Sequence, residues 1–316
     1  MKYFITYVND IRTILLNKKW KNGKDKKCDH DLIWMLYKDI DFLKYDDETI
    51  LNHFKNSYLF CIKSNLVKLS KKNRKINEFS PKSYLQDELN NRDIDEDKTY
   101  IVKPSSGSCG ENIKFFNDVS KMFLYLKKTE NNIIQEYIEN PLLISNKKFD
   151  IRQWVLITSI DPLEIHLGEF YLRFSKYDYS IKKTNKFIHL TNYAIQKKSA
   201  RKTNIKNSMW DSDSFKNYLV EKKIPFDLIE KQIKNIIIET VKEFSKYIVH
   251  RKNSFELLGY DLMIDENFKV WLIEINVSPD LSHSTPITTK IVQNSLQDIL
   301  NYKIENQNLS FFKKIY

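Results

Sequence analysis

Near its C-terminal end, the 316-residue chain carries three oxygen-bearing side chains at a spacing suited to metal binding. Glu274 and Asn276 are two residues apart, so they share one face of a strand. With a turn at 266–267, Asp261 on the preceding strand lies opposite Leu272 and diagonal to Glu274, at about 7–8 Å. Apolar flanks predict a buried hairpin rather than a solvent-exposed one, and buried carboxylates need a partner. Two carboxylates and an amide oxygen suit Mg²⁺ bound together with nucleotide phosphates.

Three alternating charges open another expected strand near the middle of the chain. Lys148, Asp150 and Arg152 are two residues apart, so they project from one face. They form either a solvated sheet edge or a clamp for a nucleotide or another anion. Arginine suits the second role because its guanidinium pairs with carboxylate or phosphate through two parallel bonds. Arg173, between aromatic residues of the next strand, leaves the same two possibilities open.

A loop rich in serine and glycine lies between two short apolar segments. It holds Gly107 and Gly110, two of only five glycines in the chain. Such a loop lets backbone N–H groups approach phosphates, and Lys103 at the end of the first segment is placed to meet their charge. The loop lacks the Gly-Lys-Ser/Thr ending and the following helix of a P-loop. Taken alone, it is more typical of an ordinary hairpin turn.

The remaining candidate nucleophiles and metal ligands form no known signature. His189 lies in a polar cluster at 189–193, and we expect it to be structural because a lone histidine more often is. There is no Ser/His/Asp or Cys/His arrangement. Cys28, Cys61 and Cys109 form no Cys-x-x-Cys pair, which argues against a disulfide framework or a zinc site and favours a reducing compartment.

Apolar periodicity predicts the elements that must position these side chains. From Thr99 onward, short apolar segments alternate with helical patterns, which is typical of an α/β or α+β fold. Strands are expected at 100–103, 113–116, 133–138, 149–159, 164–175, 255–264 and 268–276, and helices at 120–128, 226–248 and 286–302. The charged lead-in at 1–98 is expected to hold helices at 31–45 and 49–69 and a polar connector at 73–91.

Composition and charge narrow the function classes. Hydrophobic residues make up 41% of the chain, enough for a packed core. The net charge of +11 favours an anionic partner such as nucleic acid, an anionic membrane or an acidic peptide, although a lysine-rich coding bias also explains it. The densest basic runs, at 71–75 and 197–202, match no nucleic-acid motif. The apolar stretch at 3–8 is too short for a signal peptide or a membrane span, so we expect a soluble cytosolic protein.

Six stretches, read in order, resemble the tubulin tyrosine ligase-like family. They are Tyr-Ile-Val-Lys-Pro at 100–104, Ile-Ile-Gln-Glu-Tyr-Ile-Glu-Asn-Pro-Leu-Leu-Ile at 133–144, Lys-Phe-Asp-Ile-Arg-Gln-Trp-Val-Leu-Ile-Thr at 148–158, His-Leu-Thr-Asn-Tyr at 189–193, Phe-Glu-Leu-Leu-Gly-Tyr-Asp at 255–261 and Trp-Leu-Ile-Glu-Ile-Asn-Val-Ser-Pro at 271–279. Their order and spacing also match, over roughly residues 50–300, and the set is highly specific.

The resemblance implies an α+β fold of the ATP-grasp type, with ATP between two lobes. These lobes would be a central one at 99–146 and a C-terminal one at 147–303, between the lead-in and a tail at 304–316. The implied nucleotide-binding residues are Lys103, Gln135, Glu136, Tyr137, Ile138, Lys148, Asp150, Thr191 and Asn192. Asp261, Glu274 and Asn276 would hold Mg²⁺. Arg152 and Arg173 would position the carboxylates of the amino acid and the acceptor.

Further segments are similar to the glycylase subgroup of that family. They include Trp-Met-Leu at 34–36, Ile-Leu-Asn-His-Phe at 50–54, Lys-Ser-Asn-Leu at 63–66, Asn-Ser-Met-Trp at 207–210 and His-Ser-Thr-Pro-Ile-Thr at 283–288. Glutamylases usually carry a lysine inside the last helix, and Gln293 stands near that place. The cluster at 189–193, in contrast, is closer to the general family than to the glycylase variant. The subgroup implies a ligase that joins glycine to glutamate side chains of the acidic C-terminal tail of tubulin through an acyl phosphate.

Other activities remain open on the same scaffold, with glutamate as the first alternative amino acid and tyrosine as the second. An inactive module that binds tubulin tails is a different alternative. It is suggested by Cys109 and Asn112, which occupy positions where the family usually has a basic residue and a glycine. The expected partners are tubulin and a free amino acid, without nucleic acid or membrane, and the expected state is a monomer. The resemblance places such an enzyme in the cytoplasm, on the cytoskeleton and at the ciliary or flagellar axoneme.

Overall fold

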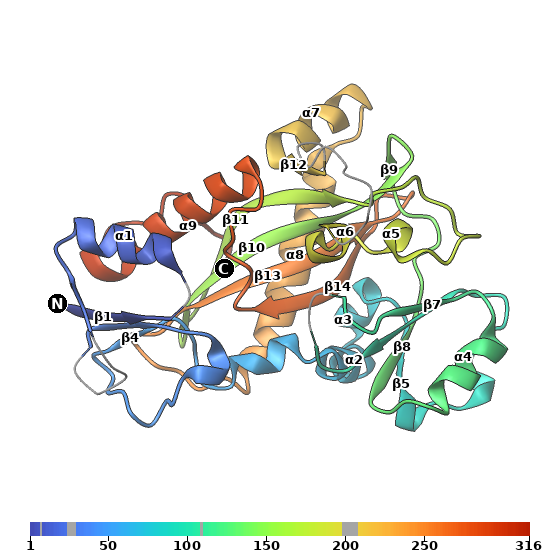
Figure 1. Ribbon diagram of the computed structural model, residues 1–316, viewed down its shortest axis with the longest axis horizontal. Helices are drawn as coiled ribbons and strands as arrows, with labels where there is room; N and C mark the ends of the chain where they lie inside the picture. Colours follow the sequence, from blue (N-terminus) through green and yellow to red (C-terminus); the bar gives the residue numbers. More distant parts are fainter. Residues whose placement is uncertain (7, 24–29, 108–109, 198–207) are drawn as a thin grey trace.

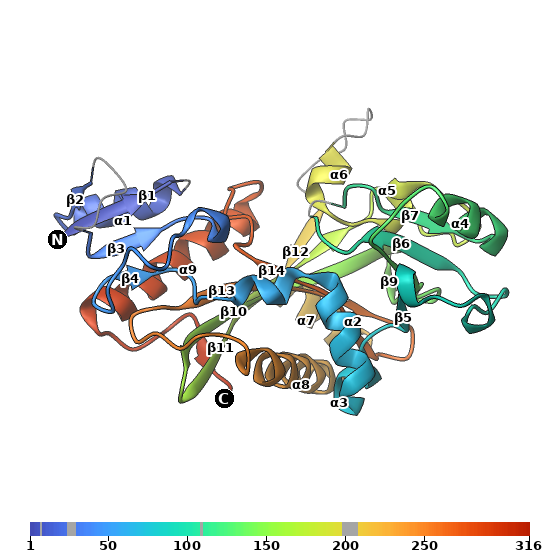
Figure 2. The same ribbon diagram turned by 90° about the horizontal axis from the view of Figure 1, so that it is seen from below.

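The computed structural model describes residues 1–6, 8–23, 30–107, 110–197 and 208–316. Within these residues the strands form three sheets. The largest sheet lies in the middle of the molecule, with an N-terminal sheet at one end and a small antiparallel sheet at the other (Figure 1 and Figure 2). No described helix is both long and apolar enough to cross a membrane. The mixture of sheets and covering helices confirms the predicted α+β class.

The N-terminal sheet is parallel and has the order β2-β1-β3-β4. Its strands are β1 (Lys2–Ile5), β2 (Lys21–Asn22), β3 (Leu32–Trp34) and β4 (Ile50–Leu51), with α1 (Asn9–Asn17) after β1. The helix predicted at 31–45 is therefore wrong, because these residues form β3 and the short 3-10 turn η1 (Tyr37–Asp39). Parallel strands buried on both faces lack the apolar alternation that identifies a strand in sequence.

The next segment leads into the small sheet. It contains η2 (Ser57–Cys61), α2 (Lys63–Lys72), α3 (Arg74–Phe79), η3 (Gln86–Glu88) and η4 (Asn91–Asp93). The helix predicted at 49–69 is thus wrong over its first half, where β4 and η2 lie, and right for most of α2. The polar connector predicted at 73–91 is also wrong, since α3 and strand β5 (Ser83–Leu85) occupy much of it. Asn73 caps α3 by accepting bonds from two backbone N–H groups.

The small sheet has the order β5-β8-β6-β7 and is antiparallel. Its other strands are β6 (Tyr100–Pro104), β7 (Lys114–Phe116) and β8 (Asn132–Glu136), and helix α4 (Val119–Leu126) covers it. Apolar side chains of the sheet pack against Met122 and Leu126 of the helix. Strands β6, β7 and β8 and helix α4 confirm the elements predicted from periodicity.

The large sheet has the order β12-β11-β10-β13-β14, with β9 on β10 and β15 on β11. Its strands are β9 (Leu143–Ile144), β10 (Lys147–Ile160), β11 (Leu163–Phe174), β12 (Met209–Asp211), β13 (Glu256–Ile264), β14 (Val270–Val277) and β15 (Lys313–Lys314). Between β11 and β12 lie the short helices α5 (Lys186–His189) and α6 (Tyr193–Lys197). Strand β10 lies between β11 and β13, so its charged opening cannot be a solvated edge.

Helices on the two faces of the large sheet complete the core. Helix α8 (Phe226–Ser245), with α7 (Ser212–Glu221), packs on one face through a continuous apolar stripe. Helix α9 (Pro286–Glu305) packs with the N-terminal elements against the other. Both long helices confirm the prediction. The C-terminal residues also pack against the large sheet and α9. Strand β15 pairs with β11, and Asp298 of α9 accepts hydrogen bonds from the backbone N–H groups of Ser310, Phe311 and Phe312.

Candidate active site

A pocket lies where the small sheet meets the large one, and it collects most of the predicted site. Its walls come from β6 and β8 on one side and from β10, β13 and β14 on the other. All nine side chains expected to bind nucleotide line it, together with Asp261 and Glu274. We call it the lysine pocket, after Lys103 and Lys148. The topology thus brings together predicted residues as far apart in sequence as Lys103 and Glu274.

A second pocket adjoins the first and holds the remaining predicted residues. Arg152, Arg173 and Asn276 line it, and it shares Asn192 and Glu274 with the lysine pocket. We call it the arginine pocket. Its far wall is the segment 277–284, which follows β14, and the start of α9. The two pockets therefore form one continuous site around Glu274 and Asn192.

Two lysines of the first pocket, Lys103 and Lys148, are buried and donate hydrogen bonds to neutral groups. Lys103 is 5% exposed and Lys148 is 3% exposed, and within the described residues neither forms an ion pair. Lys103 Nζ donates to Gln135 Oε1 at 3.0 Å, and Lys148 Nζ donates to Tyr137 Oη at 2.7 Å and to the His189 carbonyl at 2.8 Å. These neutral acceptors orient the ammonium groups without neutralising them.

Burial destabilises these two ammonium groups. It lowers the pKa of Lys103 to about 8, against an opposing effect of Glu274, and the pKa of Lys148 to about 7, against an opposing effect of Asp150. A buried cation without an anion costs free energy, which a bound anion would recover. Perturbed lysines of this kind, in a pocket, indicate a functional site for an anionic ligand.

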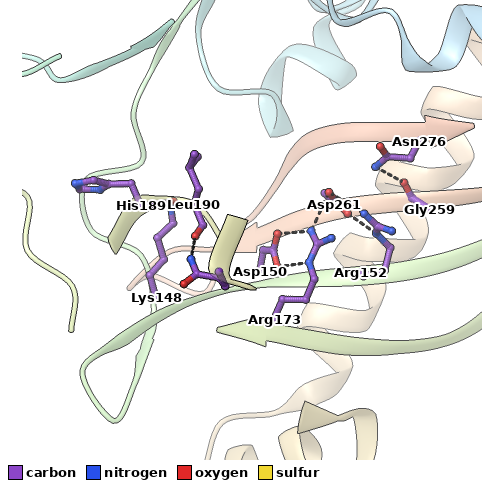
Figure 3. Close-up of polar contacts among 10 residues, drawn as sticks. Lys148, Asp150, Arg152, Arg173, His189, Leu190, Gly259, Asp261 and Asn276 are labelled. Atoms are coloured by element: carbon purple, nitrogen blue, oxygen red, sulfur yellow. Dashed lines mark hydrogen bonds and ion pairs between the residues drawn. The ribbon is translucent and has the colours of Figure 1, made fainter. Parts of the chain in front are cut away.

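Two arginines and two aspartates form a buried network under the arginine pocket (Figure 3). Arg173 makes a two-point contact with Asp150, at 2.9 Å and 2.5 Å, and Arg152 does the same with Asp261, at 2.6 Å and 3.2 Å. Arg173 Nη2 also lies 2.8 Å from Asp261 Oδ2, which joins the two pairs. Burial alone would raise the pKa of Asp261, but Arg152 and Arg173 hold it well below its usual range. The guanidinium groups are therefore fixed in orientation at the pocket floor.

The hairpin that was expected to bind metal has a different register from the prediction. Asp261 pairs directly with Glu274, whereas it was predicted to lie opposite Leu272, which pairs with Leu262 instead. The turn moves the register by one residue, so that Leu262 pairs with Leu272, and a β-bulge between Asp261 and Leu262 moves it by one more. The turn is also longer than predicted: the Asp265 side chain accepts bonds from the N–H groups of Asn267 and Lys269. The diagonal placement of Asp261 and Glu274 is therefore wrong, and the two carboxylates are closer neighbours than predicted.

The donors fit a metal that is shared with a ligand, rather than one held by the protein alone. Among the described residues, no three acidic, histidine or cysteine side chains gather closely enough to hold an ion. Asp261 and Glu274 both line the lysine pocket. Asn276 donates a hydrogen bond from Nδ2 to the Gly259 carbonyl at 3.2 Å, which leaves its side-chain oxygen available as a metal ligand. Mg²⁺ characteristically takes one or two carboxylates and completes its shell with phosphate oxygens and water.

The loop after β6 is shaped by its glycines. Gly110 has a φ of 69°, and a Cβ there would lie 2.3 Å from Ile195 Cδ1 and 3.4 Å from Asn192 Oδ1. Only glycine fits, so the loop lies directly against the 191–195 segment that carries Thr191 and Asn192. Asn112 also has a positive φ, of 57°. Cys109, the other departure noted in this loop, lies outside the described residues.

Sequence reasoning missed one cation of the site. Lys63, at the start of α2, lines the lysine pocket and donates from Nζ to the Gly107 carbonyl at 2.9 Å. The same Nζ lies 3.5 Å from Glu274 Oε2. Lys63 comes from the lead-in, where no spacing pattern links it to the loop or the hairpin. In the sequence, Lys63 was noted only as part of the Lys-Ser-Asn-Leu segment at 63–66.

His189, which was expected to be structural, contacts neighbouring protein groups and also lines the lysine pocket. Its ring stacks on Phe115 with centroids 4.0 Å apart, Nδ1 lies 3.0 Å from Tyr137 Oη, and Nε2 contacts the Lys183 carbonyl. Burial lowers its pKa to about 4, so the ring is neutral near pH 7. It supports Tyr137 and, through its carbonyl, Lys148.

The chain is similar in sequence to known proteins. The model of the Tubulin-tyrosine ligase family matches residues 43–310. Tubulin glycylase 3C of Tetrahymena thermophila is 40% identical over 242 residues, which cover 70% of this chain and 23% of the relative. Tubulin monoglutamylase TTLL4 of Mus musculus is 34% identical over 279 residues, which cover 79% of this chain and 23% of the relative. The Tetrahymena protein described as probable alpha-tubulin polyglutamylase Ttll1 is 32% identical over 304 residues, covering 82% and 73%. The chain thus spans less than a quarter of the glycylase's length.

Proposed function

The chain belongs to the tubulin-tyrosine ligase family, and from this premise we propose that it is an ATP-dependent ligase that joins glycine to glutamate side chains of the tubulin C-terminal tail. The observation that carries the proposal is the pair of pockets that meet at Glu274 and Asn192. One offers buried cations to phosphates, and the other offers oriented guanidinium groups to carboxylates. A ligase needs both beside each other, because the nucleotide must react with the acceptor carboxylate.

The position of the pocket between the small and the large sheet supports an ATP-grasp fold. The small sheet supplies Lys103 and the segment 135–138 to the lysine pocket, and the large sheet supplies Lys148, Asp150, Asp261 and Glu274. We assign the base of ATP to the segment 135–138, where β8 ends, and the phosphates to Lys103, Lys63 and the loop at 104–107. Thr191 and Asn192 then close the pocket from the side of α5 and α6.

The reaction is an amide ligation. A carboxylate oxygen of the acceptor glutamate attacks the γ-phosphorus of ATP, which gives ADP and an acyl phosphate. The amine of glycine then attacks the acyl carbon, and its nitrogen forms the amide bond as inorganic phosphate leaves and the amine gives up a proton. Arg152 and Arg173 orient the carboxylates, and Lys103, Lys148 and Lys63 offset the charge on the phosphates. Catalysis on this account is mainly positioning and electrostatic stabilisation.

Asp261, Glu274 and the Asn276 oxygen are the groups that would hold Mg²⁺ here. When bound, the ion would neutralise phosphate charge between the two carboxylates and the nucleotide. The direct cross-strand pairing of Asp261 with Glu274, and the position of both in the lysine pocket, support this assignment.

Glycine is favoured because tubulin glycylases are the more similar relatives, at 40% identity for 3C against 34% for the monoglutamylase TTLL4. Glutamate is the alternative that a specific observation supports: the match to the probable polyglutamylase Ttll1 covers 82% of this chain. The acidic tail of tubulin suits the net charge of +11, which would steer it to the site and make binding weaken with salt. We place the enzyme on the cytoskeleton, with the ciliary axoneme as its expected location.

Incubation with tubulin and Mg-ATP, with glycine, glutamate or tyrosine supplied separately, tests this proposal. Intact-mass spectrometry of the released tails reads the outcome. The proposal expects added mass with glycine only. Added mass with glutamate or tyrosine only would keep the ligase and reject glycine. Tubulin binding without addition of any of the three would instead identify an inactive binding module.

A further inference from the structure

The N-terminal region reaches the active site through a buried histidine. His53 follows β4 in the lead-in and is 1% exposed. Its Nδ1 lies 2.6 Å from Glu256 Oε1 at the start of β13, and the other Glu256 oxygen accepts the backbone N–H of Phe54 at 3.2 Å. Its Nε2 lies 3.1 Å from the Met35 carbonyl and 3.0 Å from Ser278 Oγ. The ring therefore connects three segments that are distant in sequence.

Ser278 is the member of this network that belongs to the site. It follows β14 directly, two residues after Asn276, and it lines the arginine pocket. Its φ is 54°, a left-handed conformation that costs free energy for a residue with a Cβ, and the following Pro279 restricts it further. Such a conformation persists only where the surroundings impose it. The Ser278 hydroxyl bonds to His53, and this hydrogen bond can help to impose the conformation.

The turn at Ser278 sets where the pocket wall lies relative to the arginines. A Cβ on Gly259 would lie 3.1 Å from Arg152 Cδ and 3.2 Å from Pro279 Cβ. Pro279 and Arg152 thus both lie over the same glycine of β13. If Ser278 relaxed to an extended conformation, Pro279 would leave Gly259 and the wall at 277–284 would move away from Arg152.

A second contact joins the N-terminal region to the same wall. His283 Nε2 lies 3.0 Å from Asp10 Oδ2, in the first turn of α1. The segment 277–284 is therefore held at both ends by residues from the first 53 positions of the chain. The lysine pocket, in contrast, has no lining residue from 275–285.

We propose that His53 is a positioning residue for the ligation, and that it acts through Ser278 to fix the wall of the arginine pocket. Its chemistry is a hydrogen bond that holds a left-handed turn, and it touches neither substrate nor nucleotide. Because the wall borders the arginine pocket alone, loss of the bond should weaken use of the amino acid or the acceptor and leave nucleotide binding intact. The expected effect on kinetics rests on the proposed function. The claim that His53 holds the segment 277–284 in place does not depend on it.

The variant Ser278→Ala, in the full chain, removes the hydroxyl without exposing the buried His53–Glu256 pair. We expect the KM for glycine or for the tubulin tail to rise about fivefold, the effect of one net hydrogen bond, with the Kd for ATP changed less than about twofold. Hydrogen exchange, read by mass spectrometry, should quicken in 277–285 and stay unchanged in 133–138. Thr13→Ala, which removes an exposed hydroxyl of α1, is the matched control and should change none of these values.

A second pair of variants separates positioning from folding. His53→Gln keeps a side-chain amide that can bond to Ser278, so it should retain more acceptor use than His53→Ala. Unchanged exchange in 277–285 and an unchanged KM in Ser278→Ala would overturn the proposal, as would an equal loss of ATP affinity. If no amino acid is ligated by the wild-type protein, the proposed function fails, but the exchange of 277–285 still decides whether His53 holds the wall.

Discussion

Asp261 and Glu274 face each other as direct cross-strand partners, and a β-bulge beside Asp261 creates this pairing. Their surroundings differ in a way that divides their roles. Asp261 is 2% exposed and bound to both arginines, whereas Glu274 is partly exposed and forms a longer ion pair with Lys63, at 3.5 Å. We therefore expect Asp261 to stabilise the site through the arginines, and we propose Glu274 as the carboxylate that is available to a metal and nucleotide.

The substitution Glu274→Gln should abolish ligation with little effect on folding. Loss of a carboxylate that faces the phosphates is expected to lower activity at least about 100-fold, while the thermal midpoint of the free protein stays within a few degrees. Ligation assays and differential scanning calorimetry measure the two quantities. Glu266→Gln, in the exposed turn of the same hairpin, is the control. Full activity of Glu274→Gln would remove this residue from the site.

The substitution Asp261→Asn should instead destabilise the protein. It leaves Arg152 and Arg173 buried with one carboxylate between them, which is expected to cost about 3 kcal/mol of unfolding free energy. Denaturant unfolding at neutral pH measures this loss. A variant as stable as the wild type would show that the network contributes little.

The pH dependence of that stability difference follows from the pKa of Asp261. The pKa is lowered in the folded state because burial is outweighed by the two arginines, so the stabilisation is present above the unfolded value of about 4 and is lost only as pH falls toward the folded value. We expect the difference between wild type and Asp261→Asn to stay constant from about pH 8 to 5 and to narrow below about pH 4. A difference that disappears already at about pH 6 would contradict this assignment.

Nucleotide affinity should fall as pH rises above 7. Burial lowers the pKa of Lys148 to about 7 and that of Lys103 to about 8 in the free protein, and bound phosphates favour the charged lysines. Binding at pH 8 therefore takes up protons, and the Kd for ATP should rise by up to about tenfold per pH unit for each lysine. Calorimetry in buffers of different ionisation enthalpy measures both effects. Lys148→Arg keeps its charge, so its affinity for ATP should fall less between pH 7 and 8. An ATP affinity that stays constant from pH 7 to 9 would show that the two lysines do not bind the phosphates.

Lys63 should contribute to nucleotide binding from outside the two sheets. Its ammonium bonds to the Gly107 carbonyl and approaches Glu274, so it ties the loop to the hairpin. We expect Lys63→Ala to weaken ATP binding about tenfold, the effect of one charge-assisted contact. Lys68→Ala removes an exposed lysine of the same helix and should have no effect. Equal affinities in the two variants would show that Lys63 is not part of the pocket.

Local periodicity correctly predicted the strands that carry the candidate site residues. Alternation placed Lys148, Asp150 and Arg152 on one face of a strand, and the structure has them on the face that forms the two pockets. The family resemblance then supplied the grouping of these residues with Lys103 and the hairpin. The long apolar stripe of α8 likewise predicted a helix that is present.

The remaining features depend on contacts that no local pattern contains. The longer turn and a one-residue bulge together shifted the pairing of Asp261, and no local sequence pattern marks the bulge. Arg173 was predicted to reach an anion, but its partners Asp150 and Asp261 became evident only from the fold. The lead-in was misread because strands as short as the fully buried β3 and the two-residue β4 contain too few residues to show apolar alternation. Lys63 contacts Glu274 and His53 contacts Ser278, and each pair is separated by more than 200 residues of sequence.

The transfer of oxygen from acceptor to phosphate tests the central claim most directly. A glutamate-rich tail peptide with ¹⁸O in its side-chain carboxylates would be incubated with the protein, Mg-ATP and glycine, and the released phosphate analysed by mass spectrometry. If the two pockets together form an acyl phosphate, the phosphate released per amide formed carries one ¹⁸O atom, and Glu274→Gln releases none. Release of phosphate without ¹⁸O, while the peptide stays unmodified, would mean that ATP is hydrolysed apart from any acceptor and would contradict the ligase assignment.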